Sequence, residues 1–406
     1  MSKTILMIGT LDTKGREYAH VREMIMGRGH TVFMLDAGVL GEPVYPVAPD
    51  VAAATTAEAG GVPLSVLREK RDRGYALDIM GKGARKLAVD LVAEGRVDAV
   101  LTMGGSGNTS IGATAMQGLP VGLPKLIVST MASGDVGPYV DVKDITMLYS
   151  VVDVAGFNRV SRRIFANAAG AICGLAEQAV PPSEEKPLIS ATMFGVTTPC
   201  VDRFRARMEE CGYEMLVFHA VGSGGRSMES LIADGFVSGV GDITTTEWCD
   251  ELVGGVLSAG PTRLDAAAKA GIPQVVSLGA LDMVNFGPRD TLPPQFEGRN
   301  IYVHNPQVTL MRTTADECRQ LGEIIAGKLN KATGPTALFI PLKGVSAIDV
   351  EGMPYYDPVA DKALFDALRA NIDRSKVDVV ELDLPINDPA FADAMADRLL
   401  AMLSAK

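Results

Sequence analysis

The chain has 406 residues, of which 47% are hydrophobic, 21% charged and only 5% aromatic. Its 38 basic and 49 acidic residues give a formal net charge of −11, and no basic tract offers the electrostatic footprint of a nucleic-acid-binding protein. No apolar run reaches the roughly 18 residues that a membrane span needs. We therefore expect two or three domains that bind neither nucleic acid nor membranes directly.

Both halves of the chain open with the same succession of predicted elements. The first half reads as a strand over residues 4–8, a polar turn over 9–15, a helix ending at Met26 and a strand over 31–36. The second half reads as a strand over 188–193, a turn, a helix ending at Glu210 and a strand over 214–219. This succession predicts a βαβ unit in each half.

The parallel continues along the chain. Three further predicted strands of the first half each have a counterpart in the second half. Residues 96–102 match 235–242, residues 124–129 match 273–277, and residues 144–149 match 300–305. Two more strands, over 336–340 and 377–382, each precede a helix and are expected to extend the second sheet. The likeness of the halves indicates either an internal duplication or two doubly wound domains of the ordinary kind.

A proline-rich, charged segment from Val180 to Pro187 separates the halves, as is typical of a linker. We predict a first domain over residues 1–180, a linker over 181–187 and a second domain over 188–406. The expected fold class is α/β, with two Rossmann-like domains, each a mostly parallel sheet flanked by helices.

Loops that follow the predicted strands of the first domain are rich in glycines and hydroxyls. In parallel sheets, ligands bind beyond the carboxyl ends of the strands, where loop amides and helix N-termini converge. The predicted phosphate-binding residues are Gly9, Thr10, Asp12, Thr13 and Lys14, then Gly104, Gly105, Ser106, Gly107, Asn108 and Thr109, and finally Ser129, Thr130 and Ser133. The alternative is that these loops are merely flexible turns.

Asp36 ends the second predicted strand, where an acid binds ribose hydroxyls in many nucleotide-binding folds. The alternative is a solvated carboxylate. No metal-binding triad is visible in the sequence, so Mg²⁺ is expected to arrive with the nucleotide phosphates.

Ionisable residues gather at the predicted strand ends of the second domain, an arrangement suited to acid–base chemistry. We expect His304, Glu247 and Asp282 to be catalytic, and His219, Arg226, Arg263, Arg312 and Lys343 to bind an anionic carboxylate or carbonyl substrate. His304 and Arg312 are expected to matter for activity and hardly for stability. For each residue alone, the alternative is a surface ion pair or a structural histidine.

The five cysteines are scattered and include no Cys-x-x-Cys motif. Together with an N-terminus that runs straight into a strand, they indicate a reducing, cytoplasmic location without a disulfide framework. Cys200 follows Pro199 at a predicted helix start, where a thiolate would be stabilised. The preferred interpretation is a small buried residue.

Several long segments together resemble the Tm-one type ATP-binding domain family. They are residues 9–15, 104–109, 271–277, 279–287, 304–314 and 341–346, and they are spread over nearly the whole chain. One departure is Asn108, which stands where the family pattern leads us to expect a second glycine.

The resemblance implies two Rossmann-like domains, ATP with Mg²⁺ in the first domain, and a homodimer. In a plant member a barrel-like enzyme domain follows, so a separate barrel-type enzyme is an expected partner here. The resulting hypothesis is an ATP-binding enzyme of small-molecule metabolism with its anionic substrate on the second domain. The alternative is a non-catalytic, nucleotide-gated protein that regulates a protein partner.

Overall fold

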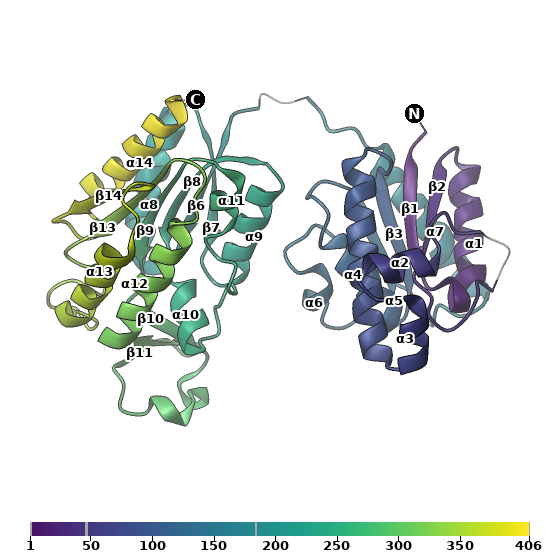
Figure 1. Ribbon diagram of the computed structural model, residues 1–406, viewed down its shortest axis with the longest axis horizontal. Helices are drawn as coiled ribbons and strands as arrows, with labels where there is room; N and C mark the ends of the chain where they lie inside the picture. Colours follow the sequence, from purple (N-terminus) through teal and green to yellow (C-terminus); the bar gives the residue numbers. More distant parts are fainter. Residues whose placement is uncertain (1, 45–47, 183–184, 406) are drawn as a thin grey trace. The chain divides into compact units, whose positions relative to one another are not determined.

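The computed structural model describes residues 2–44, 48–182 and 185–405, and the chain divides into two compact units between Pro182 and Ser183 (Figure 1). Residues 183 and 184 of the predicted linker lie outside the described residues. The α/β class and the largely parallel sheets flanked by helices are confirmed.

The first unit is built on a five-stranded parallel sheet with the order β2-β1-β3-β4-β5. Its strands are β1 (Thr4–Gly9), β2 (Thr31–Asp36), β3 (Ala99–Gly104), β4 (Lys125–Ser129) and β5 (Thr146–Tyr149). Its helices are α1 (Leu11–Gly27), α2 (Ala53–Ala59), α3 (Leu64–Lys70), α4 (Arg73–Ala93), α5 (Ser106–Met116), α6 (Gly137–Val140) and α7 (Arg159–Glu177).

Helices cover both faces of this sheet, because successive side chains of a strand point to opposite faces. Ile5 and Met7 of β1 pack in the core formed with α1 and α7, whereas Leu6 and Ile8 pack in the core formed with α4 and α5. Burial on both faces explains why the strands read as unbroken apolar runs. The order reverses between β1 and β3, so the loops after these two strands lie side by side.

Tyr18 of α1 ties these two loops to the sheet. Its buried hydroxyl donates to the carbonyl of Ile8 at 2.7 Å and accepts from the backbone N–H of Met103 at 2.7 Å. Gly9 is required beside it, since a Cβ at this position would lie 2.2 Å from the Tyr18 ring. The Tyr18 side chain therefore holds the carboxyl ends of β1 and β3 together.

The second unit contains a six-stranded parallel sheet with the order β14-β13-β9-β8-β6-β7. Its strands are β6 (Leu188–Met193), β7 (Glu214–His219), β8 (Val237–Thr244), β9 (Gln274–Gly279), β13 (Thr336–Pro341) and β14 (Val377–Leu382). Its α-helices are α8 (Thr198–Glu210), α9 (Ser223–Ala233), α10 (Glu247–Val253), α11 (Ala266–Ala270), α12 (Ala315–Leu329), α13 (Pro358–Asn371) and α14 (Pro389–Ser404).

A second, antiparallel sheet of the order β10-β12-β11 was not predicted. It consists of β10 (Met283–Phe286), β11 (Ile301–Asn305) and β12 (Val308–Arg312). The sequence analysis matched residues 300–305 with residues 144–149, which contain β5 of the first unit. This match is wrong, because β11 belongs to the antiparallel sheet and the strand that pairs with β9 in the parallel sheet is β13. The physical reason is the turn at Pro306, where Asn305 Oδ1 accepts from the Gln307 backbone N–H and joins β11 to β12 as a hairpin.

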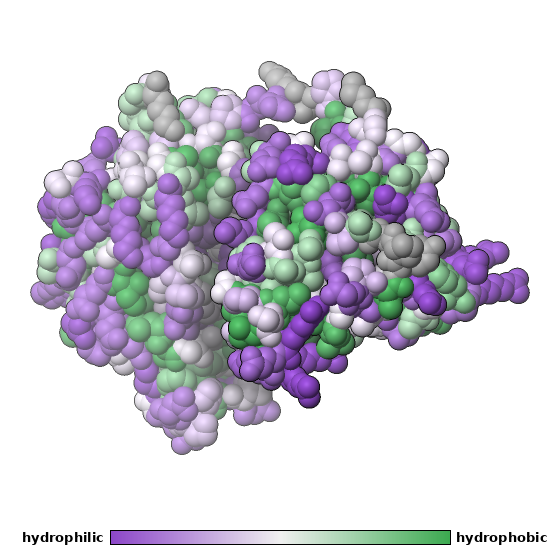
Figure 2. Space-filling view, turned by 45° about the vertical axis from the view of Figure 1, so that its right-hand side comes forward, coloured by the Kyte–Doolittle hydropathy of each residue, from purple (hydrophilic) through white to green (hydrophobic). Residues whose placement is uncertain are grey.

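Hydrophilic side chains cover much of the face shown in Figure 2, with apolar residues between them. Among the helices in the described part of the chain, none combines the length and apolarity needed to cross a bilayer.

Candidate functional site

A pocket of about 870 Å³ opens at the carboxyl ends of β1 and β3 in the first unit. Its lining comes from the loops that the sequence analysis selected and from α3 and α4. From the predicted set it contains Thr10, Asp12, Thr13, Lys14, Gly105, Ser106, Gly107 and Asn108. The volume lies within the roughly 300–1,000 Å³ of small-molecule sites.

Asn108 joins the two predicted phosphate loops. Its Oδ1 accepts from the Thr10 backbone N–H at 2.9 Å, and its Nδ2 donates to Thr10 Oγ1 at 3.0 Å. Thr10 Oγ1 also lies 2.8 Å from Thr13 Oγ1. A glycine at position 108 could make neither side-chain bond, so the departure from the family pattern has a structural role here.

The two helix N-termini at the pocket differ in their free N–H groups. At α1, Asp36 Oδ1 accepts from Leu11, and the Thr10 carbonyl accepts from Thr13 and Lys14. At α5, the first-turn N–H groups of Ser106, Gly107 and Asn108 precede the first intrahelical bond, which Thr109 donates to Gly105. Three consecutive N–H groups at the start of α5 are therefore available to an anion.

The pocket also contains three arginines that the sequence analysis missed: Arg68, Arg71 and Arg73. The side chains of Lys14, Arg71 and Arg73 make no hydrogen bond or ion pair within the described part of the chain. Arg68 donates to the carbonyls of Val39 and Gly41. The clustering of four cations between residues 68 and 73 was a visible signal, but it follows no strand and so was overlooked.

Apolar side chains form another part of the lining. Val39, Leu67, Leu77, Met80 and Ile111 form it together with Leu40, whose side chain is unusually exposed for a leucine at 85%. The pocket thus joins a cationic, amide-rich part to an apolar part.

Two acids near the pocket have different positions. Asp36 is buried, and its Oδ1 accepts from the backbone N–H groups of Leu11 and Gly38, so it shapes the loop and does not line the pocket. Burial raises the pKa of Asp36. Asp12 lines the pocket; its Oδ2 accepts from the Leu40 N–H, and its buried Oδ1 has no partner among the described residues.

Several predicted phosphate ligands do not line the pocket. Thr109 and Ser129 are buried and lie 2.6 Å apart between their hydroxyl oxygens. Gly9, Gly104, Thr130 and Ser133 are likewise outside the lining. These residues support the loops or lie beyond them.

Exchanging Gly104 or Gly105 for alanine is expected to lower the stability by different amounts. Gly104 has φ +154°, and a Cβ there would lie 2.7 Å from the Asn108 Cβ, whereas a Cβ on Gly105 would meet nothing closer than Thr130 Oγ1 at 3.8 Å. Gly104→Ala should cost about 1–3 kcal/mol, and Gly105→Ala less than about 1 kcal/mol. Thermal unfolding of both variants checks this, and equal losses would contradict it. Gly105 has a φ of −82°, which any residue can adopt.

In the second unit, Arg263 and Glu247 are paired inside the protein. Arg263 Nε donates to Glu247 Oε2 at 2.7 Å, and its Nη atoms contact both oxygens of Asp242 at 2.5 and 2.6 Å. Glu247 Oε1 accepts from the N–H groups of Gly222 and Gly225. Both side chains are at most 1% exposed, so this network links β8, α9 and α10 and offers no free group to a substrate.

Arg312 and Asp282 belong to a second buried network. Arg312 Nη2 lies 2.6 Å from Asp361 Oδ1 and 3.1 Å from Asp349 Oδ1, and its Nε donates to the Tyr355 carbonyl. Asp282 Oδ2 accepts from Ser346 Oγ at 2.7 Å, and its Oδ1 has no partner among the described residues. The Arg312 guanidinium therefore binds groups inside the protein and is not free to bind a substrate.

The other predicted substrate-site residues of this unit belong to neither buried network. His304 is exposed on the edge strand β11, near the Tyr302 ring, and His219 is exposed at the end of β7, near the Phe194 ring. Arg226 is exposed on α9. Lys343 lines a pocket of about 480 Å³ in this unit. Cys200 is buried, and burial raises the pKa of its thiol to about 12, in agreement with the interpretation as a small core residue.

The second unit is expected to lose stability as the pH rises from 5 to 8. Burial raises the pKa of Asp250 to about 7, and burial also raises the pKa values of Asp282 and Asp349. The folded chain then holds protons that the unfolded chain releases above about pH 4, so the free energy of unfolding falls by up to about 1.4 kcal/mol per pH unit for each such proton. Urea titrations followed by the fluorescence of Trp248 test this; a constant or rising value would contradict it.

Metal ligands are sparse. Among the described residues, no group of three or more His, Cys, Asp or Glu side chains is placed to hold a metal ion. The carboxylates in the first-unit pocket are Asp12, Asp72 and Asp153. Asp72 caps α4 by accepting from Tyr75. Asp153 is exposed and makes no hydrogen bond or ion pair within the described part of the chain, so Asp12 and Asp153 are the pocket carboxylates that could contact a hydrated cation.

Fold and pocket together define a two-domain α/β protein with a cationic pocket at the switch point of its first sheet. Residues 3–181 match the family described as Uncharacterised protein family (UPF0261) N-terminal domain, and residues 186–403 match the corresponding C-terminal domain. The chain belongs to the UPF0261 family.

Relatives extend across bacteria and plants. A UPF0261 protein of Clostridium tetani is 52% identical over 404 residues, covering 99% of this chain and all of the relative. One from Rhizobium meliloti is 48% identical and covers 97% of both chains. The ToMV resistance protein Tm-1(GCR237) of Solanum lycopersicum is 44% identical over 81% of this chain, a match that spans 44% of the tomato protein. A solved spinosyn rhamnosyltransferase aligns with 10% identity and a TM-score of only 0.18.

Proposed function

We propose that the first unit binds ATP as its magnesium complex. The observation that carries this proposal is the pocket in which the free α5 N–H groups, Lys14, Arg71 and Arg73 adjoin an apolar surface. A protein of net charge −11 that keeps three cations unpaired in one pocket is suited to a polyanion.

The phosphates are proposed to lie over the N-terminus of α5. The partial positive charge of a helix N-terminus and its unbonded N–H groups favour phosphate oxygens. Lys14 approaches from α1, and Arg73 approaches α5 closely enough that its Nη2 would lie 3.7 Å from a Cβ on Gly107. Charge-assisted hydrogen bonds from these side chains would add affinity and orientation.

The base is proposed to occupy the apolar part. Leu40 would lose its exposure against a planar ring, which would account for an otherwise unfavourable exposed leucine. That the base is adenine follows from the family resemblance. Magnesium would bind the phosphates, and the pocket carboxylates of Asp12 and Asp153 could supply further oxygen ligands.

We propose further that the ATP serves an enzyme of small-molecule metabolism. The alternative is a nucleotide-gated protein that regulates a partner. The two hypotheses differ in whether ATP is consumed. Phosphate release, measured with and without candidate small acids, decides between them. Turnover only with one such acid supports the enzyme; saturable ATP binding without turnover supports the gated protein.

Calorimetric titration tests the nucleotide proposal directly. ATP, ADP, AMP, GTP and inorganic tripolyphosphate are titrated with Mg²⁺ into the full chain. Affinity is expected to fall from ATP to ADP to AMP as phosphate contacts are lost, with tripolyphosphate weaker than ATP because it lacks the base. Absence of saturable ATP binding at millimolar concentration would overturn the proposal, and equal affinity for ATP and AMP would remove the phosphates from the α5 terminus.

A homodimer and a separate barrel-type enzyme partner remain proposals that rest on the family resemblance. Sedimentation at micromolar concentration, with and without MgATP, checks the dimer. A monomer under both conditions would contradict it.

A further inference from the structure

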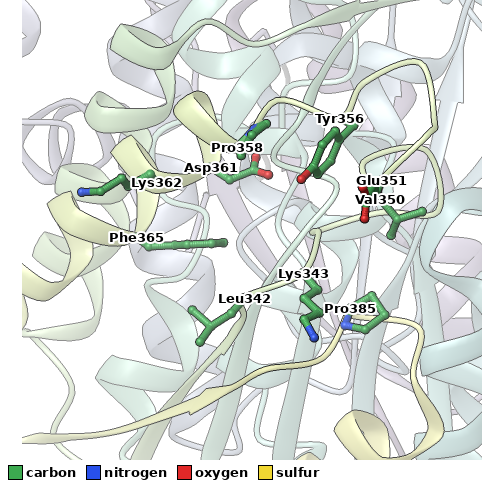
Figure 3. A pocket seen from close by; sticks show the side chains of 10 residues that line it. All are labelled: Leu342, Lys343, Val350, Glu351, Tyr356, Pro358, Asp361, Lys362, Phe365 and Pro385. Atoms are coloured by element: carbon green, nitrogen blue, oxygen red, sulfur yellow. The ribbon is translucent and has the colours of Figure 1, made fainter.

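A second pocket, of about 480 Å³, lies in the second unit at the carboxyl ends of β13 and β14 (Figure 3). Leu342 and Lys343 follow β13, Pro385 follows β14, and Asp361, Lys362 and Phe365 come from α13. Its position is the one at which parallel sheets bind ligands. It is formed by the second unit alone and is independent of the nucleotide pocket.

The cations of this pocket are already paired. Lys343 Nζ lies 2.9 Å from Asp383 Oδ2, and Lys362 pairs with Asp366 one turn along α13. In Figure 3 the Lys362 ammonium points away from the other lining side chains. The N-terminus of α13 offers no anion cradle either, since Asp357 accepts from the N–H groups of Val359 and Ala360.

One carboxylate of the pocket, in contrast, is unpaired. The carboxylate of Glu351 makes no hydrogen bond or ion pair within the described part of the chain. Asp361 lines the pocket and is held from behind by Arg312 at 2.6 Å. Asp349 Oδ1 lies 3.1 Å from the same Arg312 Nη2, behind Asp361.

Carboxyl groups outnumber free cations around the pocket. Behind it, Arg312 is the one cation that faces Asp349 and Asp361 among the described residues. At the rim, the negative charge of Glu351 has no partner in the described part of the chain. A positive group is what this surface lacks, and opposite charge at short range is favourable in a partly buried site.

The walls supply a complementary apolar surface. Leu342, Pro358, Phe365 and Pro385 enclose the pocket together with the Tyr356 ring. Figure 3 shows the Phe365 ring and the Tyr356 hydroxyl pointing toward its middle. Aromatic side chains beside carboxylates are a setting that recognises organic cations.

We propose that this pocket binds a small organic ammonium ion with an apolar body. The ammonium group would lie between Glu351 and Asp361, and the apolar body would pack on Phe365 and Tyr356. Arg312 is a positioning residue that holds Asp361 toward the ligand. The charge of the proposed ligand is opposite to that of the anionic substrate expected from the sequence, because Arg263 and Arg312 are consumed by internal pairs.

Three probes of one shape test the proposal on the full chain: 3-phenylpropylamine, 3-phenylpropanol and 3-phenylpropionate. Dissociation constants are measured by ligand-observed NMR titration at pH 7. The ammonium probe is expected to bind at least tenfold more tightly than the alcohol or the carboxylate. Comparable or tighter binding of the carboxylate, or no binding of the amine at 5 mM, would overturn the proposal.

Substitutions of lining residues test whether the amine binds in this pocket. Glu351→Gln keeps the shape of an exposed side chain and is expected to weaken the amine at least fivefold. Glu297→Gln makes the same charge change at an exposed glutamate outside the pocket and should have no effect; equal effects of the two would overturn the proposal. Tyr356→Leu should also weaken the amine, whereas Tyr356→Phe should retain most of the affinity. MgATP titrations of the same variants are expected to be unchanged, so failure here leaves the nucleotide proposal standing.

Discussion

Replacing Arg312 by alanine is expected to destabilise the second unit by about 3–5 kcal/mol. Arg312 is 4% exposed and is the cation that faces Asp349 and Asp361. Its removal leaves buried carboxylates without a counter-charge, which is the costly way to break a buried pair. The effect is measured by urea unfolding followed by the fluorescence of Trp248, the single tryptophan of the chain, which lies in α10.

Arg319→Ala is the matched control. This arginine pairs with Asp316 and Glu323 on the exposed side of α12, and exposed pairs of this kind contribute less than about 1 kcal/mol. A loss of stability no larger for Arg312→Ala than for Arg319→Ala would show that the buried network is not stabilising. The expectation from sequence that Arg312 hardly affects stability is thus reversed by its burial.

Replacing Lys14 and Arg73 together is expected to lower the affinity for MgATP at least 100-fold. Each charge-assisted hydrogen bond is worth roughly 1.5–3 kcal/mol, and about 1.4 kcal/mol corresponds to a factor of ten, so each single alanine variant should lose tenfold or more. Calorimetry of Lys14→Ala, Arg73→Ala and the double variant gives the three values.

The first-unit fold should survive these changes, because neither side chain has an ion-pair partner in the described part of the chain. Lys82→Ala, which removes an exposed lysine paired with Asp78 on α4 outside the pocket, serves as the control and should bind MgATP normally. Unchanged affinity in the folded double variant would exclude both residues from the nucleotide site.

Strand and helix positions were largely predictable from local patterns. Buried parallel strands require continuous apolar runs. The strand predicted over 377–382 has the same bounds as β14, and α14 is the helix expected after it. Loops at the ends of β1 and β3 were found for the same reason, since glycine and hydroxyl residues after an apolar run mark the carboxyl edge of a sheet.

Side-chain pairing was not predictable in this way. Arg263 and Glu247 are separated by 16 residues, and Arg312 and Asp361 by 49. Nothing local to either arginine shows that a buried carboxylate faces it. Conversely, Arg71 and Arg73 look like members of an ordinary charged surface segment until α3 and α4 place them against the loop of Asn108.

The sequence by itself determined the α/β class, the two-part organisation and the loops of the first pocket, because these follow from periodicity and composition within short windows. Only the tertiary structure decided which ionisable groups are free. A charged side chain becomes a ligand group or a structural one according to the partners that distant segments bring to it, and burial raises the free energy of leaving it unpaired. That is why Lys14 remains a candidate ligand of phosphate, whereas Arg312 is part of the core.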